Sequence, residues 1–170
     1  MGLPPIVVMG VSGSGKTTVA QQLAARVDGA EFLDADDFHP AANVTKMHAG
    51  RALTDIDRAP WLDAVGRAMG AVSGRGATPV MACSALKRGY RTRILAQEPN
   101  AFFVLLDVAR PELTRRMHAR RGHYMPESLL GSQLATLEAL GPDEPGLALP
   151  VTGPREQVVT RLLAGIVARR

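Results

Sequence analysis

The chain has 170 residues, of which 46% are hydrophobic and 21% are charged, so it is expected to fold as one packed domain and not as a disordered or fibrous chain. Its formal net charge is +4, but aromatic residues make up only 4%, which argues against a nucleic-acid partner because few rings can stack on bases. The apolar runs fall short of the roughly 20 residues of a membrane span, no signal peptide is evident, and the lone Cys83 forms no internal disulfide, so we expect a cytoplasmic protein without a membrane partner.

The first motif lies between a predicted strand, Ile6–Met9, and a predicted helix, Lys16–Val27. Residues 10–17 read GVSGSGKT, which matches the pattern G-x-x-x-x-G-K-[ST] in the strand–loop–helix context that this pattern requires. Its glycines allow the backbone to wrap a phosphate, with amide N–H groups pointing inward at the helix N-terminus. A featureless glycine-rich turn would not combine the lysine, the hydroxyl and this context. The motif therefore predicts nucleotide phosphate binding.

Within this loop, Lys16 is expected to reach the β- and γ-phosphates, and the Thr17 hydroxyl is expected to bind Mg²⁺. A GTPase switch is the rival class, but it would usually carry an N-K-x-D segment, and none is found around Lys46 or Lys87. ATP is therefore the expected nucleotide. The candidate phosphate-binding residues are Gly10, Ser12, Gly13, Ser14, Gly15, Lys16, Thr17 and Thr18.

Acidic residues follow the second predicted strand, Glu31–Leu33. The period of two of a strand is expected to point Asp34 and Asp36 to the same side, at the ligand-binding edge of the sheet. We expect Asp34 to hold Mg²⁺ through its waters, and Asp36 to bind the acceptor hydroxyl and take its proton. The alternative is a solvated acidic turn that caps a helix. His39 either shapes this loop or binds a polyol.

The third predicted strand, Pro79–Ala82, lies between helices predicted over Pro60–Val72 and Arg88–Ala96. Many P-loop enzymes place an aspartate at the end of this strand to support Mg²⁺; here Cys83 follows it, and the Asp34 pair is expected to substitute. The candidate ligands for an anionic substrate in and before this segment are Lys46, Arg58, Ser84, Lys87 and Arg91. Taken singly, each of Arg58, Lys87 and Arg91 is better explained as a surface charge; as a set on one edge of the sheet, the two explanations are equal.

A lid is predicted at about residues 115–135, after the strand Phe102–Leu106 and from within the helix Pro111–Arg120. Arg116 and Arg120 are four residues apart and share a helix face. Side chains of this kind that close over ATP stabilise the moving phosphoryl group and exclude water. We expect Arg116 to bind the nucleotide, Arg120 to act in catalysis and His123 to contact the substrate; a solvated basic helix face is the alternative. Asp107, just before the helix, is interpreted as structural.

The remaining elements complete an alternating pattern of strands and helices. A helix is predicted over Glu127–Leu140, a strand over Leu147–Val151 and a final helix around Val158, Leu162 and Ile166, which recur every four residues. The pattern predicts an α/β P-loop NTPase fold, with a five-stranded parallel sheet covered on both faces, in a single domain over residues 1–170. Ligands of such sheets bind beyond the carboxyl ends of the strands, at residues 10–17, 34–39, 83–87 and 107–110.

Taken together, these segments resemble the gluconate kinase family, within the shikimate-kinase-like branch of P-loop kinases. The resemblance covers nearly the whole chain. Its most specific parts are MGVSGSGKT (9–17), FLDADDFHP (32–40), N-x-x-K-M (43–47), LTDIDRAPWL (53–62), CSALKRGYR (83–91) and ARRGHYMPESLLGSQLATLE (119–138). One departure is Ala35, where the family pattern has glycine; alanine is nearly as small.

The resemblance implies a transferase that moves the ATP γ-phosphoryl group to the 6-hydroxyl of D-gluconate, with Mg²⁺, in carbohydrate metabolism. It also implies a mobile lid, a homodimer and an adenine site bordered by residues 152–154. It leaves open which of Arg58, Lys87 and Arg91 meets the substrate carboxylate. The alternatives are a kinase of the same fold for another small hydroxy acid, such as shikimate, or for a nucleotide, and a non-catalytic nucleotide-binding module.

Overall fold

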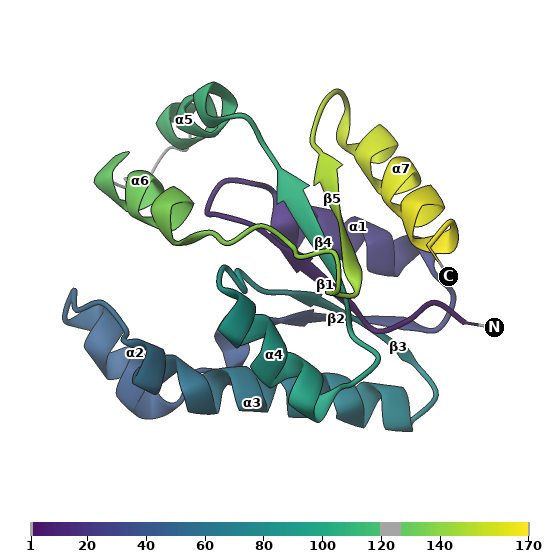
Figure 1. Cartoon of the computed structure of the whole chain (residues 1–170), viewed down its shortest axis with the longest axis horizontal. Coiled ribbons are helices and arrows are strands. Elements are labelled where there is room, and N and C mark those ends of the chain that lie inside the picture. Colours follow the sequence, from purple (N-terminus) through teal and green to yellow (C-terminus); the bar gives the residue numbers. More distant parts are fainter. Residues whose placement is uncertain (1, 120–126, 170) are drawn as a thin grey trace.

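Five parallel strands form one sheet in the order β2–β3–β1–β4–β5, as seen in a computed structural model that describes residues 2–119 and 127–169 (Figure 1). Every neighbouring pair is parallel, and Ile6 at the start of β1 lies opposite Val80 of β3 and Phe102 of β4. The strands are β1 (Ile6–Met9), β2 (Ala30–Asp34), β3 (Thr78–Ala82), β4 (Phe102–Asp107) and β5 (Gly146–Pro150). The predicted α/β fold and its parallel sheet are confirmed.

The helices alternate with the strands as predicted, with additions in the segment after β2. They are α1 (Lys16–Arg26), the 3₁₀ helix η1 (Ala35–Phe38), α2 (Ala41–His48), α3 (Asp55–Gly74), α4 (Arg88–Gln97), α5 (Arg110–Ala119), α6 (Glu127–Thr136) and α7 (Arg155–Val167). Neither η1 nor α2 was predicted. The described residues contain no helix long and apolar enough to cross a membrane.

Two helix boundaries differ from the prediction for identifiable reasons. α3 begins at Asp55 and not at Pro60, because the side chains of Thr54 and Asp57 form a reciprocal capping box ahead of the proline. α6 ends at Thr136, four residues before the predicted end. Beyond it, the N–H of Glu138 donates to the carbonyl of Leu86 at 2.8 Å, so the chain leaves the helix to pair with the loop after β3.

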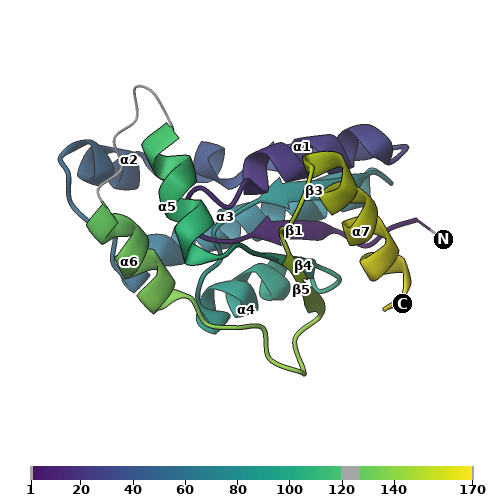
Figure 2. The same ribbon diagram turned by 90° about the horizontal axis from the view of Figure 1, so that it is seen from above.

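The sheet is buried on both faces. Ile6 and Val8 of β1 belong to a core shared with α1 and α7, whereas Val7 and Met9 belong to a core shared with α3 and α4 (Figures 1 and 2). All four residues are fully buried, which explains why β1 is an unbroken apolar run and does not alternate with polar residues.

A third apolar cluster places α5 and α6 at the carboxyl end of the sheet. It joins Val11 of the loop after β1 to Val108 after β4, to Leu113 of α5 and to Leu130 of α6. In Figures 1 and 2, α2, α5 and α6 gather at one end of the molecule, and the two termini lie at the other end. The predicted ligand-binding edge therefore has these three helices around it.

Candidate active site

The loop of residues 10–15 makes a tight turn between β1 and α1. Gly10 has φ 154°, and a Cβ there would lie 2.8 Å from the Ser14 Oγ. Gly15 is left-handed, with φ 89°, at the N-cap of α1. Both positions need glycine because a side chain would clash in the first case and strain the backbone in the second. The loop therefore has the compact shape that a phosphate cradle requires.

Not every amide of this loop is available to a phosphate. The N–H of Ser14 donates to the Val11 carbonyl at 3.1 Å, and the N–H of Ser12 donates to Gln133 Oε1 at 2.6 Å. The Ser14 hydroxyl is 1% exposed, has no hydrogen-bond partner among the described residues and lies against Gly10. The amides of Gly13, Gly15 and the first turn of α1 are therefore the better candidates for phosphate contacts.

Arg116 of α5 lies over the same loop, as the nucleotide-binding prediction requires. Its Nη1 donates to the carbonyl oxygens of Gly13 and Ser14, both at 3.3 Å, while its Nε donates to Glu112 at 2.7 Å. Hydrogen bonds from Arg115 and Arg116 hold the pKa of Glu112 at about 2, so this carboxylate stays ionised at neutral pH. Arg120 and His123 lie outside the described residues, and their roles remain predictions.

Asp34 and Asp36 lie together at the end of β2, but not for the reason that the strand pattern suggested. The chain leaves the extended conformation at Asp34, whose carboxylate accepts the N–H of Asp36 at 3.0 Å and caps η1. The period-two argument was therefore wrong beyond Asp34, and the predicted alternative, a capped acidic turn, describes the local structure. Asp36 and Asp37 are exposed on this turn. Capping occupies one oxygen of Asp34 and leaves the other for a ligand.

Three of the predicted site charges, those of Lys16, Asp34 and Asp36, act on Cys83. Burial raises the pKa of the Cys83 thiol, which follows β3, to about 12, while the charge of Lys16 acts to lower it and those of Asp36 and Asp34 act to raise it. The charges of the phosphate loop and of the acidic turn therefore both act on the residue that follows β3. The neutral, fully buried thiol is not a nucleophile.

Thr17 and Asp34 remain the candidate Mg²⁺ ligands. Among residues 2–119 and 127–169, no three His, Cys, Asp or Glu side chains are placed to hold a metal. A hydroxyl and a carboxylate near a phosphate loop still suit Mg²⁺, because this ion keeps several waters and is usually held by one or two protein oxygens together with substrate phosphates. The residues present fit such a site.

His39 directly follows η1 and packs against α3. Its ring stacks on Trp61 with centroids 4.3 Å apart, and its Nδ1 is 3.4 Å from the Asn43 amide nitrogen. The indole N–H of Trp61 donates to the carbonyl of Ala35 at 2.7 Å, which ties η1 to α3. Burial lowers the pKa of His39, partly opposed by Asp36. The structure supports the loop-shaping alternative for His39 directly, and its contact with a polyol remains a prediction.

The lowered pKa of His39 predicts a pH-dependent contribution to stability. Below the ordinary value of 6.5, the unfolded chain takes up the proton before the folded chain does, so stability falls as the pH drops through this range. The melting temperature of the wild type should therefore fall more than that of His39→Gln between about pH 7.5 and about pH 5.5. Equal falls in both proteins would contradict the burial of a neutral imidazole.

Lys46 and Lys87 each pair with an aspartate in the first turn of α3. Lys46 Nζ contacts Asp57 Oδ2 at 2.5 Å, and this hydrogen bond is the main reason that the pKa of Asp57 is lowered to about 2. Lys87 Nζ lies 3.0 and 3.1 Å from the two oxygens of Asp55. These lysines join α2 and the β3–α4 loop to α3, a role that their sequence positions did not indicate.

Asp55 is the centre of a polar cluster at this edge. The Tyr90 hydroxyl donates to it at 2.5 Å, and Arg58 lies 4.0 Å from it and 3.4 Å from the Tyr90 oxygen. Hydrogen bonds from Tyr90 and Lys87 lower the pKa of Asp55, and the same aspartate raises the pKa of Lys87. The structure thus brings Arg58 and Lys87 together around Asp55, and their binding of an anionic substrate remains a prediction.

Arg91 is not part of this cluster, and its predicted role in substrate binding is not supported. Its side chain is fully buried, with Nε 2.6 Å and Nη2 3.0 Å from the carboxylate of Glu144. Its remaining contacts are backbone carbonyls of Ala85, Leu86, Glu138 and Ala139. Ala85 has a left-handed φ of 42°. Arg91 therefore fixes the shape of the loop that carries Ser84 and Lys87.

Removing Arg91 is expected to damage stability more than substrate affinity. Arg91→Met leaves the Glu144 carboxylate buried without its partner, which should cost about 3–5 kcal/mol of unfolding free energy and lower the melting temperature on the order of 10 °C. The KM for the acceptor should stay within about threefold of the wild-type value, since no solvent reaches this side chain. A large rise in that KM with an unchanged melting temperature would contradict this role.

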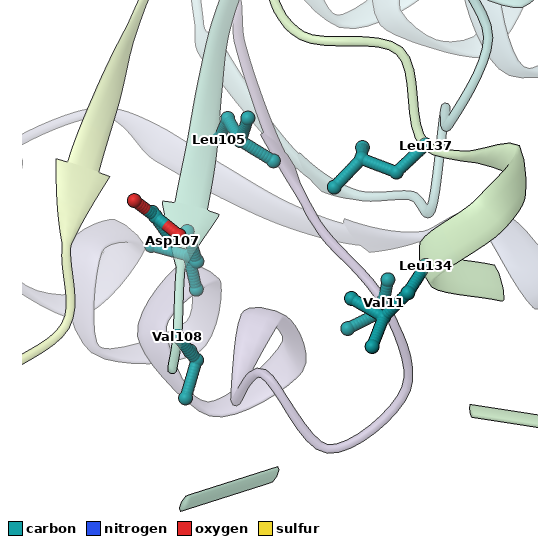
Figure 3. A pocket seen from close by; sticks show the side chains of 7 residues that line it. Val11, Leu105, Asp107, Val108, Leu134 and Leu137 are labelled. Carbon is teal, nitrogen blue, oxygen red and sulfur yellow. The ribbon is translucent and has the colours of Figure 1, made fainter. Parts of the chain in front are cut away.

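An apolar hollow lies beside the phosphate loop, between β4 and α6 (Figure 3). Val11, Leu134 of α6 and Leu137 just after α6 line one side of it, opposite residues 105–108, and among the described lining residues only Asp107 is charged. Asp107 is exposed, and its carbonyl accepts the N–H of Val151, which connects β4 to the chain after β5. This contact is made by the backbone, so a structural role for the Asp107 side chain remains a prediction.

The fold and this site define a P-loop nucleotide-binding protein with an acidic acceptor side. The sequence matches the model of a family described as "AAA domain" over residues 6–140. It is 51% identical over 147 residues to gluconokinase from Gluconobacter oxydans, covering 85% of this chain and 82% of that protein. It is 40% identical over 154 residues to the thermoresistant gluconokinase of Escherichia coli, covering 90% and 87%.

Solved structures agree with this similarity. A gluconokinase from Sinorhizobium meliloti superposes with a TM-score of 0.85 at 42% identity, covering 99% of this chain and 94% of that one. The chain belongs to the gluconokinase family of P-loop kinases. The resemblance predicted from the sequence motifs is confirmed.

Proposed function

We propose that this chain is a gluconokinase, which transfers the γ-phosphoryl group of ATP to the 6-hydroxyl of D-gluconate and yields 6-phospho-D-gluconate and ADP. The observation that carries the proposal is the 51% identity to a gluconokinase over most of both chains. The phosphate loop and the acidic turn at one edge of the sheet supply the two substrate sides that such a transfer needs.

The proposed roles follow from where the side chains lie. Asp36 accepts the proton of the 6-hydroxyl as its oxygen attacks the γ-phosphorus and ADP leaves. Lys16 and Arg116 balance the charge of the transferring group. Thr17 and Asp34 would hold Mg²⁺, which, when bound, supplies further charge neutralisation on the phosphates. Arg120 would add a cation from the lid.

Lys87 and Arg58 are proposed to receive the carboxylate end of gluconate. Two cations and the Tyr90 hydroxyl already surround one carboxylate, that of Asp55, and they are partly exposed. Because Arg91 is buried in an ion pair with Glu144, Lys87 and Arg58 are the better supported candidates among the three predicted ligands of the carboxylate. Ser84, Lys46 and His39 are proposed to line the sugar chain. A cytoplasmic homodimer remains part of the proposal.

A coupled assay of ADP formation tests the function. ATP-dependent turnover is expected with D-gluconate and not with shikimate, glucose or AMP. Turnover with shikimate alone would favour a kinase of the same fold for another hydroxy acid. Binding of ATP without turnover of any of these compounds would favour the non-catalytic module. Lys87→Ala should raise the KM for gluconate about tenfold or more, consistent with loss of a charge-assisted hydrogen bond.

A further inference from the structure

A single side chain from α6 makes two hydrogen bonds to the phosphate loop. Gln133 Oε1 accepts the N–H of Ser12 at 2.6 Å, and Gln133 Nε2 donates to the Ser12 Oγ at 3.2 Å. The two residues are 121 positions apart in the chain, and both bonds are partly buried. The carboxamide makes both bonds because its oxygen accepts and its nitrogen donates, and it does so without carrying a charge.

The packing around these bonds ties α6 to the loop. Leu130 of α6 is fully buried in the cluster that includes Val11, and Leu134 and Leu137 pack against this cluster and line the hollow in Figure 3. Gln133 thus stands on a helix that is already fixed against the loop. Its amide group needs no further ordering to reach Ser12, which makes the contact well suited to hold the loop in one shape.

Ser12 is well placed to influence phosphate binding. It directly precedes Gly13, whose amide is a candidate phosphate donor, and the Gly13 and Ser14 carbonyls are held by Arg116 of α5. The loop is therefore held by one side chain from α5 and by one from α6. Small displacements of such groups are costly, because a misplacement of about 1 Å can reduce rates about 10²-fold.

We propose that Gln133 is a positioning residue for ATP: it fixes the Ser12 peptide so that the following loop amides stay aimed at the phosphates, and it couples α6 to the occupied loop. The inference rests on the proposed function, since it adds Gln133 to the residues that shape the proposed ATP site. It concerns ATP and not the acceptor, because the side-chain hydrogen bonds of Gln133 among the described residues go to the phosphate loop.

Replacing Gln133 tests this role in the full-length protein. Gln133→Met keeps the length of the side chain and removes both hydrogen bonds. We expect the dissociation constant of ADP, measured by calorimetry, and the KM for ATP to rise about tenfold, while the KM for gluconate stays within about twofold and the melting temperature changes little. Ser132→Ala, an exposed neighbour on the same helix, is the matched control and should leave all four quantities unchanged.

A second variant tests proximity to the phosphates. Gln133→Glu keeps the acceptor for the Ser12 N–H but adds a negative charge beside the loop. Its ADP affinity should fall below that of Gln133→Met at low ionic strength, and the difference should shrink as salt is added. This variant also decides the question if Gln133→Met does not fold.

The outcomes separate the inference from the function on which it rests. Normal ADP affinity in a folded Gln133 variant would overturn the inference alone. A parallel loss of stability, ATP affinity and gluconate affinity in both variants would also overturn it, because that result indicates a purely structural contact. Failure of the wild type to bind ADP would overturn the proposed function and the inference with it.

Discussion

Replacing Lys16 with alanine is expected to reduce turnover with ATP and gluconate by about 10³-fold or more, since loss of a single charge-stabilising donor typically costs about 10²–10³ and this lysine serves both binding and transfer. Lys16 opens α1 directly after the left-handed Gly15, at the point where the loop meets the positive end of the helix. Its charge acts to lower the pKa of the Cys83 thiol, which follows β3. The measurement is the steady-state rate of ADP formation.

The control for Lys16 removes a cation at the opposite end of the sheet. Arg75, which follows α3, pairs with Glu31 in the first half of β2 at 2.8 Å, and both side chains are about half exposed. Arg75→Met should therefore retain the wild-type rate, with little change in stability. Lys16→Arg should stay inactive, because a guanidinium fork does not replace a compact ammonium in a tight loop. Substantial activity in Lys16→Ala would remove the phosphate-loop assignment.

Replacing Asp36 with asparagine is expected to lower kcat about 10²–10⁴-fold, the usual contribution of a general base. Asparagine keeps the size of the side chain and leaves the backbone N–H of residue 36 free to donate to Asp34, so the turn should survive. The dissociation constant of ATP should change by no more than about threefold, because this carboxylate is proposed to contact the acceptor and not the nucleotide. Single-turnover kinetics with saturating ATP measure the effect on phosphoryl transfer.

Two neighbouring aspartates make the test of Asp36 specific. Asp37 is equally exposed on η1, and Asp37→Asn should change kcat by less than about twofold. Asp34→Asn keeps the cap on η1 and should instead raise the Mg²⁺ concentration needed for half-maximal rate. A kcat close to that of the wild type in Asp36→Asn would assign the base to another residue.

The two sides of the site differ in how far they could be predicted from the sequence. The phosphate loop is a contiguous segment whose residue types are each required by the local backbone or by phosphate binding. Its residues and its position after β1 could therefore be predicted. The acidic turn was located correctly, but its geometry was not, because the chain turns into a 3₁₀ helix where a strand period was assumed. An aspartate whose carboxylate can accept the N–H of the residue two positions later is a local capping signal that could have corrected this.

The basic residues show where prediction ends. Lys87 and Arg91 are four residues apart at the start of the same helix, and nothing in that spacing distinguishes them. In the structure one meets Asp55 at the edge of the site, and the other is buried against Glu144, 53 residues away. Burial depends on which distant segment covers each side chain, and the sequence around a residue does not encode that.

By itself, the sequence determined the class of this protein: a parallel α/β sheet, a phosphate loop after its first strand, and family motifs from that loop to residue 138. Such features depend on residues within a few positions of one another and on hydrophobic periodicity, and both can be read from the sequence. Only the tertiary structure decided the partners of Lys46, Lys87, Arg91 and Gln133. Those partners come from segments that meet because the sheet and its helices bury their apolar faces together, and this packing is a property of the whole chain.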